Sequence, residues 1–322
     1  MTDLVSMLDG MSARELDAFF HQTDAETVVA LAHGTPDADL ERLLADETVR
    51  TAAIGSVLAR LDEYAVPERL EKVDGRVGFR LRLPRRGEET YLLLFQDGEV
   101  AVVPPAEVGR HAADVTIGCG AVDFVRMVTG GANAALLHLA DRLSIDGDEL
   151  LALDVGGVFR VPGTDGVAVD PTALDPVDVA VAIAKVRDAH LHAVMAGGLR
   201  EIALGEVFRR LPDFVDSAKA RRHEIAVGFR IGGRPDGEVD RYVVRLAGGE
   251  AVVERIDGEG GRGDRDATLS LDGAQFLKLV TGHLNPVTGV MRGQLKVRGD
   301  VKAALTFSGL MNIPSATARA QA

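Results

Sequence analysis

The 322-residue sequence has no tryptophan, only three tyrosines, and a single cysteine. One cysteine excludes an intramolecular disulfide, as is typical of proteins from a reducing compartment. Cys119 has no basic neighbour in the sequence, so we do not expect it to act as a thiolate nucleophile. No apolar run approaches the roughly 18 residues that a membrane-spanning helix needs. These absences leave an ordinary soluble protein as the expected class.

Basic residues are in the minority, with 36 Lys and Arg against 49 Asp and Glu, a formal net charge of −13. This balance argues against nucleic acid, or a strongly anionic membrane, as the main partner. One basic cluster, Lys219–His223, could support transient contact with a bilayer surface, and a solvated helix end before a strand is the competing interpretation. No partner protein is predicted.

Targeting signals are missing as well. The N-terminus, MTDLVSMLDG, carries two acidic residues and no basic segment followed by an apolar core, so it does not resemble a signal peptide. The C-terminus, ATARAQA, does not match a peroxisomal signal of the Ser-Lys-Leu type. We therefore expect a cytoplasmic location.

The sequence also lacks the common catalytic motifs: G-x-S-x-G, the P-loop, H-E-x-x-H and CxxC. His190 and His192 stand two residues apart, a spacing that puts them on different faces of a helix and makes a poor metal clamp. Gly258–Gly263 matches G-x-G-x-x-G, but it lies between two predicted strands, so we interpret it as a hairpin loop. We predict no enzyme activity, no cofactor and no metal.

The most informative stretch that is present is Phe276–Asp300. Thr281-Gly282 ends an apolar helix, because glycine tolerates the left-handed conformation of a helix C-terminus. Asn285 and Pro286 then suit the cap and the first position of a second helix. Gln294–Arg298 alternates apolar and polar residues, which predicts a strand, and Asp300 is placed to cap a final helix.

The same order occurs in a weaker form in Phe124–Asp148, and the repeat extends over most of the chain at an offset of about 150 residues. VGFRL at 77–81, for example, returns as VGFRI at 227–231. Such self-similarity predicts two tandem copies of one unit. Each unit should contain, in order, helices, three or four antiparallel strands, two helices, a strand and a last helix.

In the first copy, helical spacing covers residues 13–20, 26–33, 38–45 and 49–64, and strand alternation begins at Val77 and Tyr91. Helices followed by strands indicate an α+β fold, a sheet covered on one face by helices. The predicted boundaries are an N-terminal helical extension at 1–24, a first unit at 25–160, a linker at 161–176 and a second unit at 177–322.

Three stretches of the second unit resemble the sterol carrier protein type 2 domain: GEVFRRLPDFVDSAKA at 205–220, the long segment DATLSLDGAQFLKLVTGHLNPVTGVMRGQLKVRGDVKAAL at 266–305, and FSGLMNIP at 307–314. The first unit departs from this pattern, since Leu284-Asn285-Pro286 is replaced there by Ala132-Asn133-Ala134. The resemblance implies a mostly antiparallel five-stranded sheet, helices on one side, and an apolar tunnel between the layers. It also implies a sterol, fatty acid or fatty acyl-CoA ligand and no catalysis.

The expected lipid site is mainly in the second unit, where the motif is intact. The residues predicted to contact the ligand are apolar and come from the strands and helices on either side of the tunnel: Phe229, Tyr242, Val244, Leu246, Phe276, Val280, Leu284, Val290, Met291, Leu305 and Met311. A solid core would need the same residues. The alternative is therefore a filled-core interaction or accessory module with no lipid ligand.

Overall fold

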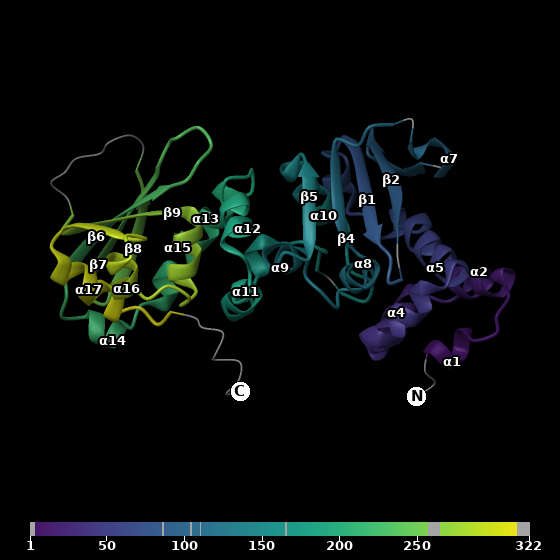
Figure 1. Cartoon of the computed structure of the whole chain (residues 1–322), viewed down its shortest axis with the longest axis horizontal. Helices are drawn as coiled ribbons and strands as arrows, with labels where there is room; N and C mark the ends of the chain where they lie inside the picture. The colour runs from purple at the N-terminus through teal and green to yellow at the C-terminus, as the bar shows by residue number, and fades with distance from the viewer. Residues whose placement is uncertain are drawn as a thin grey trace. The chain divides into compact units, whose positions relative to one another are not determined.

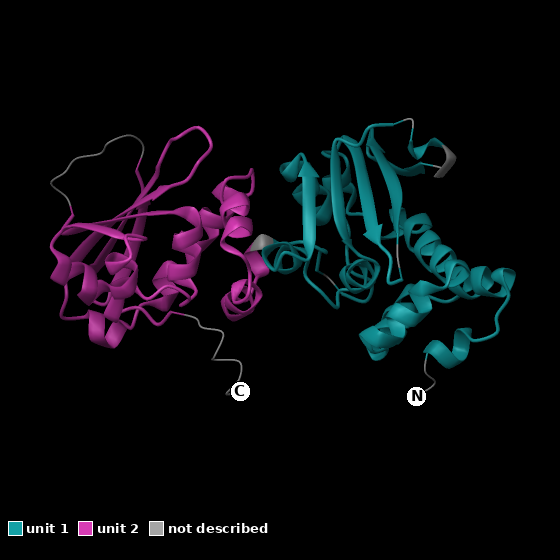
Figure 2. Cartoon of the chain, in the orientation of Figure 1, with its two compact units in different colours: residues 1–170 teal, residues 171–322 magenta. Residues whose placement is uncertain are grey.

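The computed structural model describes residues 4–85, 87–103, 105–109, 111–164, 166–256 and 265–313. The chain forms two compact units, Met1–Asp170 (unit 1) and Pro171–Ala322 (unit 2), which Figure 2 distinguishes by colour. Each unit contains one five-stranded sheet with helices packed against it. The predicted fold class, α+β with two tandem units, is confirmed.

Unit 2 follows the predicted order of elements (Figure 1). Its first half is helical, with η2 (Pro171–Ala173), α11 (Pro176–Ile183), α12 (Asp188–Val194), α13 (Arg200–Arg210), η3 (Leu211–Phe214) and α14 (Ser217–Ala220). The strands are β6 (Ile225–Gly232), β7 (Asp240–Ala247), β8 (Glu250–Arg255), β9 (Ala267–Asp272) and β10 (Lys296–Gly299). Helices α15 (Gly273–Val280) and α16 (Pro286–Met291) precede β10, and α17 (Val301–Gly309) follows it.

Unit 1 repeats this plan. Its helices before the sheet are α1 (Leu4–Leu8), α2 (Ala13–Gln22), α3 (Ala25–Gly34), α4 (Asp37–Ala45), α5 (Glu47–Ala59), η1 (Asp62–Tyr64) and α6 (Pro67–Leu70). The sheet comprises β1 (Gly75–Arg82), β2 (Glu88–Gln96), β3 (Glu99–Val103), β4 (Val115–Gly120) and β5 (Leu143–Gly147). Helix α7 (Pro105–Val108) precedes β4, α8 (Ala121–Val128) and α9 (Ala134–Leu139) precede β5, and α10 (Glu149–Val158) ends the unit.

Both sheets are mixed. The strand orders are β3-β2-β1-β4-β5 and β10-β9-β6-β7-β8. The central pair, β1 with β4 or β6 with β9, is parallel, and the other pairs are antiparallel. The two units therefore share one topology, which is the structural counterpart of the sequence repeat.

Helices α1 and α2 have no counterpart in unit 2. They form a separate apolar cluster with the outer side of α4 and α5, and its buried members are Leu4, Leu8, Leu16, Phe20 and Leu40. The shared plan begins with α3, which corresponds to α11: Asp24 caps the first of these helices and Asp175 the second. Ser12 and Glu15 form a capping box at the start of α2.

Two predicted boundaries are wrong. The helix expected at 49–64 ends at Ala59, where the amides of Arg60 and Leu61 donate to carbonyls only three residues back and tighten the chain into η1. The strand expected at 294–298 begins at Lys296. The amides of Gln294 and Leu295 both donate to the Gly289 carbonyl and close α16, so they are not available to pair with β9.

Gly299 has a backbone role that no other residue type can fill without strain. Its φ is +87°, and an added Cβ would lie 2.4 Å from the Asp266 carbonyl oxygen. We expect Gly299→Ala to lower the free energy of unfolding by about 2–3 kcal/mol, measured by urea denaturation. Gly309→Ala is the control, because an added Cβ there meets nothing within 4 Å and alanine favours a helix. Equal stability of the two variants would contradict this account.

Candidate functional site

The interior of unit 2 is organised around five aromatic rings from both layers. Phe208 of α13 stacks on Tyr242 of β7 with a centroid distance of 3.8 Å, and on Phe276 of α15 at 5.2 Å. Phe229 of β6 meets Phe208 edge-on at 5.5 Å and also contacts Phe276 and Phe307. These contacts fix α13, α15 and α17 over the same face of the sheet.

The predicted ligand residues divide into an inner and an outer group. Six of them are buried: Phe229, Tyr242, Val244, Leu246, Phe276 and Leu284. Three of these alternate along β7 and therefore point toward the helices. Leu284 lies under α16, where an added Cβ on Gly289 would come within 3.3 Å of it. Val280 and Met311 are half-buried.

The other three predicted residues lie on the surface. Val290 and Met291 of α16 are 44% and 82% exposed, and Leu305 of α17 is 49% exposed. Val287 and Val301 of the same two helices are exposed as well. Helix α16 ends shortly before the edge strand β10 in the sequence, and α17 packs against that strand. We call these five exposed side chains the apolar rim.

A buried ion pair joins the helix layer to the sheet of unit 2. Arg200, at the start of α13, donates from Nε to Asp240 Oδ2 at 2.8 Å, and both side chains are 7% exposed. Its other nitrogens donate to the carbonyls of Met195, Ile231 and Gly232. The guanidinium is therefore well satisfied, so we assign it a structural role.

Unit 1 has the same pair in a more exposed form. Arg50 donates to Glu89 through Nε at 3.0 Å, and Glu89 also accepts from the Tyr91 hydroxyl at 2.9 Å. Hydrogen bonds from Arg50 hold the pKa of the Glu89 carboxyl below its ordinary value, and burial raises the pKa of Tyr91. Leu58 replaces the ring of Phe208 in this unit, so its interior has fewer aromatic contacts.

Cys119 lies in β4 of unit 1 and is fully buried. Burial, followed by the nearby negative charge of Asp123, raises the pKa of its thiol to about 12. Since the thiolate is the reactive form, we expect no labelling by a disulfide reagent at pH 8 until the chain unfolds. One equivalent should then react in denaturant. Rapid labelling of the folded protein would show that β4 opens readily.

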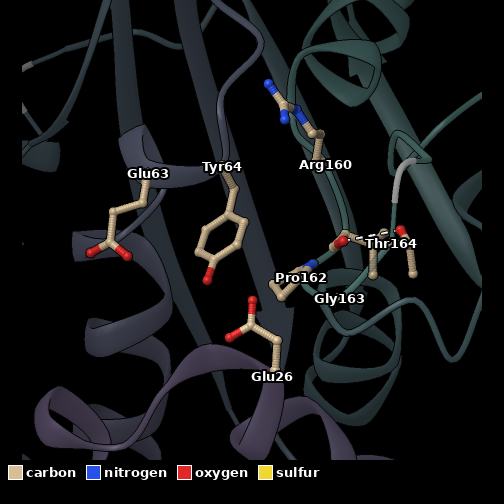
Figure 3. A pocket seen from close by; sticks show the side chains of 8 residues that line it. Glu26, Glu63, Tyr64, Arg160, Pro162, Gly163 and Thr164 are labelled. Carbon is tan, nitrogen blue, oxygen red and sulfur yellow. Dashed lines mark hydrogen bonds between the residues drawn. The ribbon is translucent and has the colours of Figure 1, made fainter.

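A polar pocket of about 310 Å³ lies at the surface of unit 1 (Figure 3). Glu26, Glu63 and Tyr64 line one side, and the chain at 160–164 lines the other. Burial, and then the charge of Glu26, raises the pKa of the Tyr64 hydroxyl. Arg60 donates to Glu63, which neutralises that carboxylate. The pocket is polar and open, unlike the interior of unit 2, and does not suit an apolar ligand.

Other kinds of site are not found in the described part of the chain. No three His, Cys, Asp or Glu residues gather there as metal ligands would. Among those same residues, no helix has both the length and the apolar character to cross a bilayer. The motif Gly258–Gly263 lies outside the described residues.

Comparison with known proteins identifies the family. The model of the SCP-2 sterol transfer family matches the chain twice, over residues 54–160 and 208–312. The chain belongs to the SCP-2 sterol transfer family. The two matches coincide with the sheets of units 1 and 2 and the helices that follow their strands. Membership of this family gives the chain a lipid-binding role in the broad sense.

Individual relatives of the SCP-2 type cover parts of the chain. Sterol carrier protein 2 of Arabidopsis thaliana is 36% identical over 67 residues, which is 21% of this chain and 51% of that protein. The chain thus spans about half the length of this curated relative. A solved structure, apo sterol carrier protein 2 from Yarrowia lipolytica, has 23% identity and a TM-score of 0.25, covering 39% of this chain and 91% of that chain.

A second solved structure is the sec-alkylsulfatase Pisa1 from Pseudomonas sp., with 21% identity and a TM-score of 0.30 over 35% of this chain and 17% of that chain. With TM-scores below 0.5, neither structure indicates what this chain does.

Two interior residues were missed by the prediction from sequence, Phe208 and Phe307. A signal for Phe208 was present, because Leu204, Phe208 and Leu211 have the spacing of a buried helix face. Phe307 follows the long matching segment, and the docking of α17 on β6 and β9 turns its ring into the interior.

Proposed function

We propose that the chain is a non-catalytic carrier that holds the apolar part of a lipid between the sheet and the helices of unit 2. The observation that carries this proposal is that α17 buries Ala304 and Phe307 in the interior and exposes Val301 and Leu305, while α16 exposes the rest of the apolar rim. A carrier needs both an apolar interior and a place where a lipid can enter.

Burial of an alkyl chain supplies enough free energy for such binding. Each buried methylene contributes about 0.8 kcal/mol, so ten of them approach the roughly 8 kcal/mol of a micromolar complex. Within the proposal, Phe229, Tyr242, Phe276 and Leu284 line the site. Val290, Met291 and Leu305 guide the lipid at its entrance, where the flexible thioether of Met291 can adapt to different chains.

A filled-core module without a ligand is the second candidate, and one observation favours it. The rings of Phe208 and Tyr242 stack at 3.8 Å, so these two side chains fill the space between their layers. A lipid would have to pass beside this stack or displace Phe208.

Native mass spectrometry of the full chain separates the two candidates. We expect a fraction of the purified protein to carry an added mass that is released on denaturation and is recovered as lipid by solvent extraction. The protein should also take up an added fluorescent fatty acid or sterol with a micromolar Kd. A single apo mass together with no uptake of either probe would favour the filled-core module.

A further inference from the structure

Charge is distributed unevenly between the two units. Residues 171–322 carry 21 Lys and Arg against 19 Asp and Glu, a formal net charge of +2, so residues 1–170 account for −15. The net negative charge of the whole chain therefore comes from unit 1, and unit 2 is slightly basic. The location of the basic residues in that unit decides what its surface can bind.

Many of the basic residues of unit 2 lie on the sheet face that the helices leave open. In β6 the residues Ile225, Val227, Phe229 and Ile231 are buried against the helix layer, so the alternating residues point the other way. Arg230 is one of these. The strand register places Arg241 of β7 directly opposite Arg230 on one side and Ser270 of β9 on the other. Lys296 of β10 is in turn opposite Ser270.

The next rows of the same face add further cations. Arg298 of β10 stands opposite Thr268, and Arg245 lies two residues along β7 from Arg241. The side chain of Arg265 lies over Gly228, because an added Cβ there would meet its Cδ at 2.7 Å. We define the basic face by these six residues: Arg230, Arg241, Arg245, Arg265, Lys296 and Arg298. Acidic residues lie at the margins of this face: Glu250 and Glu254 on the edge strand β8, and Asp272 opposite Gly232 at the end of β9.

Within the described residues, four members of the basic face form no ion pair: Arg230, Arg241, Lys296 and Arg298. Arg230 and Arg241 are moreover directly opposed on neighbouring strands, an arrangement of like charges that destabilises a sheet. An anion bound between them would relieve this repulsion.

Unit 1 shows that the fold does not require these charges. In its sheet Arg80 occupies the position of Arg230, and it forms an ion pair with Asp146 at 2.6 Å. Asp146 has the same place in the sheet register as Arg298. Thr90 and Ser144 likewise stand where unit 2 has Arg241 and Lys296. The cations at these three positions, and an arginine without an ion pair at the position of Arg80, are therefore features of unit 2 alone.

We propose that the basic face of unit 2 docks on an anionic phospholipid bilayer. Its cations span three strand spacings, about 14 Å, on one face of the sheet, a width over which several phosphates of a membrane surface can be contacted at once. Val252, 65% exposed, lies on the same face opposite Arg245 and adds an apolar contact.

A single-stranded nucleic acid is less favoured as the occupant. Sheets that bind such strands stack the bases on aromatic rings, and the strands of unit 2 carry no aromatic residue on this face. Docking also goes beyond lipid carriage, because it is a property of the surface and does not depend on a ligand in the interior.

The test is co-sedimentation of the full chain with phosphatidylcholine vesicles, with and without phosphatidylglycerol. We expect binding only to the anionic vesicles, and weaker binding as salt shortens the range of the electrostatic attraction. The key variant, R241T/K296S/R298D, installs the residues of unit 1. Each basic residue contributes about fivefold to partitioning, so this variant should bind about a hundredfold more weakly.

The matched control is K219S/R221T/R222D, which makes the same charge change in the basic cluster at Lys219–His223. There Lys219 already forms an ion pair with Asp216 at 2.8 Å, and we expect near-normal vesicle binding. Unchanged binding of the key variant, or an equal loss in the control, would overturn the proposal. So would tighter binding of a single-stranded oligonucleotide than of vesicles. Thermal unfolding of each variant checks that the sheet is intact.

Discussion

Replacing Leu284 with arginine should weaken lipid uptake at least a hundredfold. Leu284 is buried beneath α16 among the residues proposed to line the site. A guanidinium there removes apolar contact with the ligand, and loss of contact with about four methylenes corresponds to roughly 3 kcal/mol. The measurement is displacement of a bound fluorescent fatty acid, with near-ultraviolet circular dichroism to confirm the fold.

Two matched variants make this result interpretable. Val181→Arg introduces the same charge at an exposed position of α11, outside the proposed site, and we expect it to leave the equilibrium Kd within threefold. Ala132→Arg places arginine at the equivalent position of unit 1, where the motif is altered, and should also preserve binding. If Ala132→Arg abolishes uptake and Leu284→Arg does not, the ligand is in unit 1.

Arg200→Met is expected to produce the largest loss of stability, about 3–5 kcal/mol. The substitution leaves Asp240 buried without its main partner, and removing one member of a buried ion pair costs far more than the pair contributes. Arg234 contacts the other oxygen of Asp240 at 3.3 Å and compensates only partly. For a unit of this size the change corresponds to a fall in Tm of roughly 10 °C, measurable by calorimetry.

Removing both charges should restore most of that stability, so Arg200→Met with Asp240→Leu is the diagnostic double variant. Arg209→Met serves as the surface control. Its partner Glu206 keeps a second contact with Arg210, and an exposed ion pair contributes at most about 1 kcal/mol. Comparable losses for Arg200→Met and Arg209→Met would mean that the interior around Asp240 is hydrated.

Local sequence signals predicted the helices on either side of β10 well. Asn285 caps α16 with its side chain, Pro286 takes the first helical position, and Asp300 caps α17, as expected. Each of these interactions joins residues at most three positions apart, so the chain does not need its tertiary fold to specify them. The duplication and the family were also evident from sequence, because the glycine and cap positions recur with their backbone roles.

The sequence by itself therefore determined the two-unit α+β fold, its order of elements and the identity of the family. The tertiary structure alone decided which way side chains face when a helix is short and apolar on several sides. It placed Val290 and Met291 on the surface, and it paired Arg200 with Asp240 across 40 positions. Likewise, Arg230 and Arg241 are eleven residues apart in the chain, and only the register of β6 and β7 brings their like charges together. Long-range packing and strand register arise from the sum of many weak contacts, so no local pattern encodes them.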